Sequence, residues 1–232
     1  MSSIFADAME KEVIWHDLGS QEPMMEKPEG EMIVVAAPVF GGRIPSVVRE
    51  KIEKLSGTGK KAVTIVVYGN RAYEDALLEM NDILMKCGFT VIASGAFVAQ
   101  HSMAPEVGAG RPDGEDEKEI HKFTEAVKKS TAAENVHVPG NRPYKPEMNM
   151  PVTPVSLPSC TMCGKCVTVC PTNAISVSDG AVITDAEKCI LCMACTHVCA
   201  EQARIRPLPL QQKTEQMLGA LKSVRNKNEV FL

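Results

Sequence analysis

The feature that most constrains this chain is a pair of matching cysteine groups in its carboxyl-terminal half. Eight of the nine cysteines lie between Cys160 and Cys199. Both groups have the spacing Cys-x2-Cys-x2-Cys-x3-Cys and are offset by 29 residues: Cys160, Cys163, Cys166 and Cys170, then Cys189, Cys192, Cys195 and Cys199. Ala174 recurs as Ala203 at the same offset. The segment is therefore an internal duplication.

This spacing is typical of ligands to cubane iron–sulfur clusters. Three cysteines at intervals of three residues can present thiolates to three corners of a [4Fe–4S] cluster, while the fourth completes the other cluster. We therefore expect two crossed ligand sets. The first set is Cys160, Cys163, Cys166 and Cys199, and the second set is Cys189, Cys192, Cys195 and Cys170. Each half needs the other, so folding and cluster insertion should be coupled.

Zinc sites, disulfides and a single cluster each account for less of the cysteine pattern. Structural zinc uses four ligands in two Cys-x2-Cys pairs and does not require the third and fourth cysteines in fixed register. A disulfide scaffold needs an oxidising compartment, and the opening residues MSSIFADAMEKE do not form an export signal. A single cluster beside a degenerate second site would be expected to lack a ligand. The ninth cysteine, Cys87, is expected to be a buried structural thiol.

The residues before the cysteines alternate between strand and helix patterns, which predicts an α/β fold with a parallel sheet. Strands are predicted at Met32–Ala37, Ala62–Tyr68 and Thr90–Val98, and helices at Ser46–Leu55, Ala72–Cys87 and Asp113–Thr131. We expect an α/β domain over residues 1–132, a Pro-rich linker over 133–157, a cluster domain over 158–207 and a tail over 208–232. One polar helix is predicted in the tail, and a hairpin over Ile175–Thr184 around Asp179-Gly180.

Two loops follow the first two predicted strands, and ligands bind at such carboxyl ends of parallel strands. With the segments APVFGGRIP, VVYGNRAYEDALLEM and GAFVAQHS, the chain resembles the flavodoxin–ferredoxin fusion proteins, and residues 158–207 resemble the bacterial two-cluster ferredoxins. That resemblance implies an FMN site. Its flavin-side contacts would be Pro38, Phe40, Gly41, Gly42, Tyr68, Gly69 and Asn70.

The chain departs from this resemblance at its start. A flavodoxin-like domain begins with a strand and a turn that holds the FMN phosphate at a helix N-terminus, and the chain as given has neither. Ser3–Met9 is predicted to end the first helix and Glu12–His16 to form the second strand, with Trp15 in the core. The missing first strand belongs between the second and third. Truncation, direct pairing of the flanking strands and a strand supplied by a partner all account for this, and we favour truncation.

Net charge and hydropathy limit the classes of function that the chain can have. A net charge of −4 gives no electrostatic basis for nucleic-acid binding. The longest apolar run, Met32–Phe40, has nine residues, whereas roughly 20 are needed to cross a bilayer. We expect a cytoplasmic electron carrier that relays single electrons between redox partner proteins through two [4Fe–4S] clusters. An FMN-coupled oxidoreductase is the alternative, although we expect no FMN in the chain as given because the phosphate turn is absent.

Overall fold

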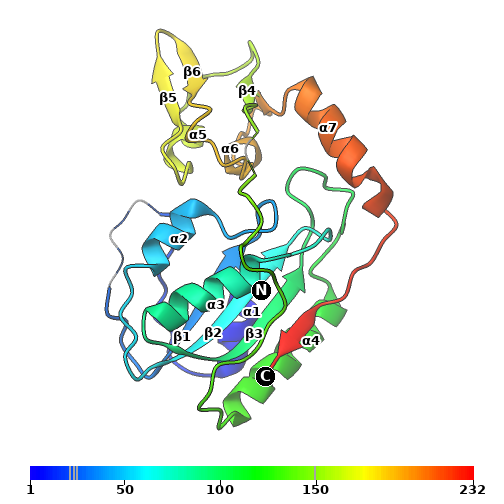
Figure 1. The fold of residues 1–232 in the computed structure, drawn as a ribbon. Helices are drawn as coiled ribbons and strands as arrows, with labels where there is room; N and C mark the ends of the chain where they lie inside the picture. Colours follow the sequence, from blue (N-terminus) through cyan, green and yellow to red (C-terminus); the bar gives the residue numbers. More distant parts are fainter. Residues whose placement is uncertain (21, 23, 25, 149) are drawn as a thin grey trace.

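Three parallel strands of a four-stranded sheet form the centre of the lower lobe in Figure 1. The computed structural model describes residues 1–232 except 21, 23, 25 and 149. The sheet contains β1 (Met32–Pro38), β2 (Lys61–Tyr68) and β3 (Thr90–Val98), side by side in that order. β2 is paired on both edges and buried on both faces, as its near-continuous apolar sequence predicts. The predicted strands are therefore confirmed.

Helices cover both faces of this sheet. α2 (Ser46–Ile52) and α3 (Ala76–Lys86) pack on one face, and α1 (Ser2–Met9) and α4 (Gly114–Lys129) pack on the other. On the second face the rings of Phe5 and Phe97 lie 5.6 and 5.8 Å from that of Phe123, a separation at which aromatic pairs attract. The lower lobe is thus a three-layer α/β structure, which confirms the expected α/β class.

The predicted strand over Glu12–His16 is wrong. Residues 12–16 pair with no strand in the described part of the chain, and Trp15 is 59% exposed, so its predicted place in the core is wrong too. A strand forms only where its backbone groups find partners. β1 pairs with β2 alone, and the two flanking strands therefore do not pair directly. Val34 of β1 is exposed at the same unpaired edge.

The cysteine groups form the upper lobe with two small pairs of antiparallel strands (Figure 1). Its strands are β4 (Val155–Ser156), β5 (Ile175–Ser178), β6 (Ala181–Thr184) and β7 (Arg204–Ile205), and its helices are α5 (Lys165–Thr168) and α6 (Ala194–His197). β4 pairs with β7 and β5 with β6, both antiparallel. The predicted hairpin is confirmed, since Asp179 and Gly180 have the φ values of 51° and 72° that a tight hairpin turn needs.

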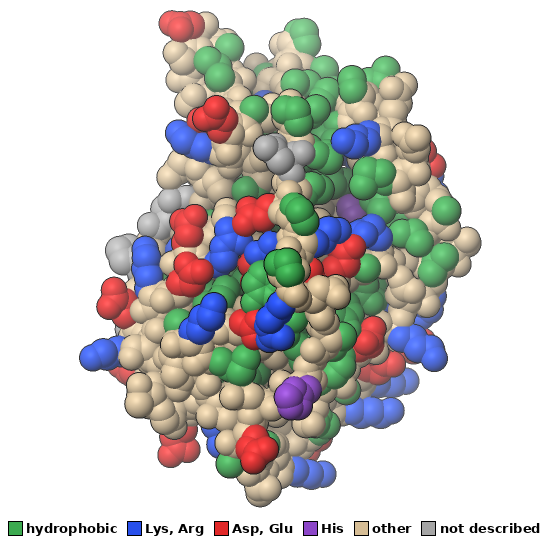
Figure 2. Space-filling model, viewed as in Figure 1, with side chains coloured by type: hydrophobic (Ala, Val, Ile, Leu, Met, Phe, Trp, Pro, Cys, Tyr) green, Lys and Arg blue, Asp and Glu red, His purple; other side chains and the backbone are tan. Residues whose placement is uncertain are grey.

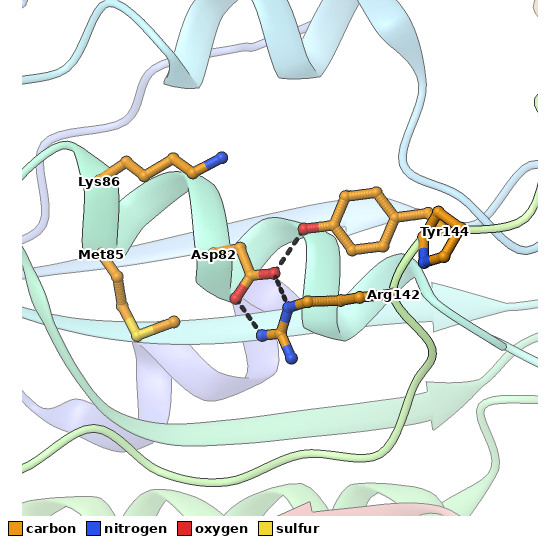
Figure 3. Close-up of a pocket in the computed structure, with 6 residues that line it drawn as sticks. Asp82, Met85, Lys86, Arg142 and Tyr144 are labelled. Carbon is orange, nitrogen blue, oxygen red and sulfur yellow. Dashed lines mark hydrogen bonds and ion pairs between the residues drawn. The ribbon is translucent and has the colours of Figure 1, made fainter.

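The linker before this lobe is fastened to α3 by carboxylates. Asp75 accepts hydrogen bonds from the backbone of Asn141 and Lys145 at 2.8 and 2.7 Å. Asp82 accepts from the Arg142 guanidinium at 2.5 and 2.8 Å and from the Tyr144 hydroxyl at 2.5 Å, as Figure 3 shows. A hollow of about 730 Å³ lies at this contact. Because its polar groups satisfy one another, we interpret it as part of the anchorage of the linker.

The tail departs from its predicted single helix. α7 (Leu208–Leu218) is followed by the 3-10 turn η1 (Gly219–Leu221), after which the chain returns to the sheet. There β8 (Glu229–Phe231) pairs antiparallel with β3 (Figure 1). No helix in the described part of the chain is long and apolar enough to cross a membrane. The predicted boundaries at residues 132, 157 and 207 stay predictions.

A buried ion pair holds this returning segment. Arg111 bonds both oxygens of Asp116, through Nε at 2.9 Å and through Nη2, and donates to the Asn226 carbonyl at 2.6 Å. Asn228 donates to Asp116 at 2.8 Å, and Asp116 also completes the capping box that Asp113 begins at α4. Burial acts to raise the pKa of Asp116, but Arg111 and the other donors hold that pKa below its usual value.

Replacing Asp116 should therefore be costly. Asp116→Ala leaves Arg111 buried without its anion, and we expect the free energy of unfolding to fall by about 3–5 kcal/mol. Urea unfolding followed by circular dichroism measures this. Glu125→Ala is the control, since Glu125 is half exposed and pairs with Lys128 at the surface. An equal loss in the two variants would contradict the prediction.

The same ion pair predicts a pH dependence. The folded pKa of Asp116 is depressed, so its stabilisation should be complete above about pH 4, near the pKa of an unfolded Asp. It should disappear as the pH falls through the folded pKa. Unfolding free energies of the parent chain and Asp116→Ala should consequently converge in acid. Curves that stay parallel to about pH 2, well below the unfolded pKa, would contradict this assignment.

Candidate metal centre

The two cysteine loops have the same backbone conformation at the same offset. Met162 and Leu191 have φ values of 54° and 55°, and Gly164 and Met193 have 78° and 64°. These left-handed residues stand between successive cysteines and turn the chain tightly. A single turn of helix, α5 or α6, then begins in each repeat at equivalent residues. The duplication seen in the sequence is therefore also a duplication of structure.

Cys170 lies among the cysteines of the second group. Burial raises the pKa of the Cys189, Cys192 and Cys195 thiols, and the nearby Cys170 raises each further. That electrostatic effect acts over a short range in a folded chain. In the first group, Cys160 has the same effect on Cys166. Cys170 packs in one buried cluster with Cys195 of the second predicted set and Cys166 of the first, and Cys189 lies against that cluster. The membership of both sets, including Cys163 and Cys199, stays a prediction.

The two groups differ in their exposure. In the first predicted ligand set Cys163 is exposed and Cys166 is buried, whereas in the second set Cys170 and Cys195 are buried and no cysteine is exposed. On the second group's side, Leu191, Met193 and Leu210 form an apolar cluster, against which Cys189 packs together with Met103, Met150 and Val152. That cover comes from α7, the linker and the loop after β3. The second group therefore faces the lower lobe, and the first group has a ligand at the surface.

Backbone donors also point to sulfur. The Ala174 N–H donates to Cys170 Sγ at 3.2 Å, and the Thr172 hydroxyl lies 3.7 Å from the same atom. Such bonds favour negative charge on the sulfur and help to set the potential of a bound cluster.

The described thiols do not form a site for a single metal ion. Within the described residues, no three His, Cys, Asp or Glu side chains converge closely enough to hold one metal ion. Four sulfurs around zinc all lie about 2.3 Å from one centre. The four thiolates of a [4Fe–4S] cluster bind four different iron atoms, so they stand further apart. The donor set, all sulfur with N–H groups directed at it, fits iron–sulfur chemistry.

The predicted flavin loops are adjacent. The Val39 N–H donates to the Val67 carbonyl at 2.9 Å, and the Asp75 N–H to the Gly42 carbonyl at 3.0 Å. The carboxyl ends of β1 and β2 therefore bring the two loops together. Pro38 is exposed and Phe40 is half-buried.

The remaining flavin-side residues are covered by other parts of the chain. The Asn70 amide donates to the Val224 carbonyl at 2.6 Å and accepts from the Asn226 N–H at 3.0 Å. The Tyr68 hydroxyl donates to the Lys227 carbonyl at 3.1 Å. These bonds belong to the returning tail, which sequence reasoning left without a role.

The glycines of these loops are covered as well. A methyl group on Gly41 would overlap Met148 of the linker, one on Gly42 would overlap Glu74, and one on Gly69 would overlap His101. The space that a flat ring needs beside these glycines is filled by side chains. His101 is hydrogen-bonded within its own loop, because its Nδ1 accepts from the Met103 N–H at 3.1 Å. Cys87, predicted as a buried thiol, is partly buried and donates to the Ile52 carbonyl.

Comparisons with known proteins address the cysteine-rich segment. A family model for the 4Fe–4S binding domain matches residues 155–176. The chain is 46% identical over 56 residues to the polyferredoxin-like subunit of an aliphatic sulfonate oxidoreductase of Pyrococcus furiosus, covering 23% of this chain and 30% of that subunit. It thus spans about a third of that relative.

Shorter relatives are covered more fully. An uncharacterized ferredoxin-like protein of Haemophilus influenzae is 35% identical over 65 residues, which are 25% of this chain and 76% of that protein. A ferredoxin-like protein in the vnf region of Azotobacter chroococcum mcd 1 is 39% identical over 54 residues, 21% of this chain and 83% of the relative.

The crossed arrangement predicts which iron is lost when Cys170 is replaced. Cys170→Ala should first damage the cluster held by Cys189, Cys192 and Cys195, because the Cys170 thiol lies beside them. Iron analysis and EPR spectra of the anaerobically reconstituted chain measure the loss. The control is Cys87→Ala, which should keep the full iron content. Damage confined to the cluster of Cys160, Cys163 and Cys166 would contradict crossed ligation.

Proposed function

Because the chain belongs to the ferredoxin-like 4Fe–4S proteins, we propose that it relays single electrons between redox partner proteins through two [4Fe–4S] clusters. The observation that carries this proposal is that Cys170 of one repeat packs in a buried cluster with Cys195 of the other, against which Cys189 also lies. When bound, each cluster would accept and release one electron at a time. With four thiolates assigned to each cluster, no iron keeps a position for a substrate, which favours electron transfer as the activity.

The first ligand set is the proposed point of exchange with a partner. Cys163 is exposed, and so is its chain neighbour Met162, at 45%. Leu157, also exposed, lines a hollow together with Met162. Figure 2 shows hydrophobic side chains over much of the upper lobe, while acidic and basic side chains are interspersed lower down. Such a surface suits a partner that excludes water by apolar contact, which shortens the path to the cluster.

The second ligand set is proposed as the inner member of the relay. Its cover of Leu191, Met193 and Leu210 keeps water away from the thiols. The same cover contacts Met103, in the loop after β3. An electron held there lies close to the carboxyl edge of the parallel sheet.

FMN-coupled catalysis is the less favoured candidate. The two loops lie together, as that function requires, but their glycine faces are filled by Met148, Glu74 and His101. The polar groups of Asn70 and Tyr68 are bonded to the tail. The residues present therefore do not fit an isoalloxazine ring, and we derive no flavin step.

Cofactor analysis tests both candidates together. The anaerobically reconstituted 232-residue chain should hold close to eight iron atoms, and acid extraction should release no flavin. Iron near four atoms would contradict two clusters. Flavin released in a 1:1 ratio to protein would favour the FMN-coupled alternative instead.

The difference in exposure predicts an order of oxidative damage. A limiting amount of ferricyanide should destroy the cluster at Cys163 first, because only that set has an exposed ligand among the described cysteines. The EPR spectrum that survives should match that of Cys163→Ala, which lacks the first set. A surviving spectrum like that of Cys170→Ala would contradict the assignment of the outer cluster.

A further inference from the structure

A buried arginine occupies one of two equivalent positions in the duplicated lobe. Arg204 begins β7 and is 4% exposed. Its counterpart 29 residues earlier is Ile175, which begins β5 and is 6% exposed. Both side chains are buried, but only one carries a charge. The two halves therefore differ electrostatically at the same place in the fold.

The charge of Arg204 has no carboxylate partner among the described residues. Its Nη1 donates to the Ser156 hydroxyl at 3.0 Å and its Nη2 to the Thr184 hydroxyl, and both acceptors are neutral. Its Nε, which is buried, has no acceptor in the described part of the chain. A buried cation in such surroundings is unfavourable unless an anion lies nearby. The described residues do not supply one.

Cysteines of both predicted ligand sets surround this guanidinium. Arg204 opposes the rise that burial causes in the pKa of Cys166, Cys189 and Cys195, so its charge reaches all three thiols. At Cys195 both the charge of Arg204 and its hydrogen-bonding capacity act to lower the pKa of the thiol. Arg204 further lines a hollow of about 510 Å³ together with Cys160. Cys160 and Cys166 belong to the first set, and Cys189 and Cys195 to the second.

We propose that Arg204 is a positioning residue that compensates cluster charge and raises the reduction potential, most strongly at the cluster bound by Cys195. This inference rests on the proposed function. Each reduction adds one electron from the redox partner and hence one negative charge, while the guanidinium keeps its proton throughout. A buried cation stabilises the reduced form more than the oxidised form, and an N–H directed at sulfur acts in the same sense.

The test uses two variants of Arg204 in the full chain. Arg204→Ile introduces the residue found at the equivalent position, Ile175. Arg204→Lys keeps the positive charge but removes the planar set of guanidinium N–H donors. Lys188→Gln is the matched control: it also removes one positive charge next to a ligand, Cys189, but its side chain is 60% exposed and screened by water. Iron is counted first, and midpoint potentials are then measured by EPR-monitored redox titration.

Arg204→Ile should make reduction of the Cys195 cluster at least tenfold less favourable, which is about 59 mV for one electron. Arg204→Lys should lie between this variant and the parent chain, and Lys188→Gln should stay near the parent. A shift in Arg204→Ile no larger than that of the control, with eight irons bound, overturns the proposal. Absence of clusters from the parent chain would instead refute the proposed function, so the two failures are distinguishable.

A second measurement uses the parent chain, so its main result does not depend on whether an Arg204 variant still assembles its clusters. In the parent chain with arginine labelled by 15N at Nε, pulsed EPR of the reduced protein should detect 15N coupled to a cluster. Labelled Arg206→Lys should keep the coupling, since the Arg206 guanidinium is engaged by the Met103 carbonyl. A parent spectrum without 15N coupling overturns the proposal.

Discussion

The proposed crossing of the cysteine ligands is the constraint on which the upper lobe would depend. Its apolar core consists of a few small side chains and the cysteines themselves, and a core of that size supplies little stability alone. The proposed iron–sulfur bonds would then hold the two repeats together, since each repeat supplies a ligand to the other's cluster. Folding of this lobe and acquisition of iron become one process.

The lower lobe fixes where this metal centre sits. Carboxylates on α3 fasten the linker before the lobe, and Arg111 and Asp116 fasten the segment after it. The apolar cover of the second ligand set contains residues from α7, the linker and the loop after β3. The inner thiols are thus buried partly by side chains that the α/β layers hold in place. Burial of this kind helps to set the reduction potential of an iron–sulfur cluster.

Local patterns predicted local elements well. Thr90–Val98 matches β3 in full, because its apolar β-branched run stays buried wherever it is placed in the sheet. The repeat at 29 residues predicted two equivalent loops, and their φ values agree. The strand at Glu12–His16 failed because a strand needs a neighbour, and β1 pairs on its other edge only. The Glu229–Phe231 strand went unpredicted for the converse reason: three residues carry no pattern until they meet β3.

The candidate sites also differ in whether local sequence could predict them. Spacing alone placed the cysteines, because their function depends on intervals within one short segment. The covering of Asn70 and Tyr68 by the tail involves residues more than 150 positions away, and nothing near these residues in the sequence indicates it. Arg204 left a signal that sequence reasoning missed: at the position where one repeat has Ile175, the other has a charge.

The antiparallel pairing of β8 with β3 connects the metal-binding lobe to the sheet at both of its ends. Because the chain leaves the sheet after β3 and α4 and rejoins it at β8, the lobe is an insertion within the α/β domain, with a connection at each end. A module on a single flexible tether samples many orientations and carries its electron by swinging between partners. An inserted module held at both ends gives up that freedom. Under the proposed function, partners would then have to come to a fixed surface for electron exchange. The distance between the proposed inner ligand set and the sheet would be set once, by folding.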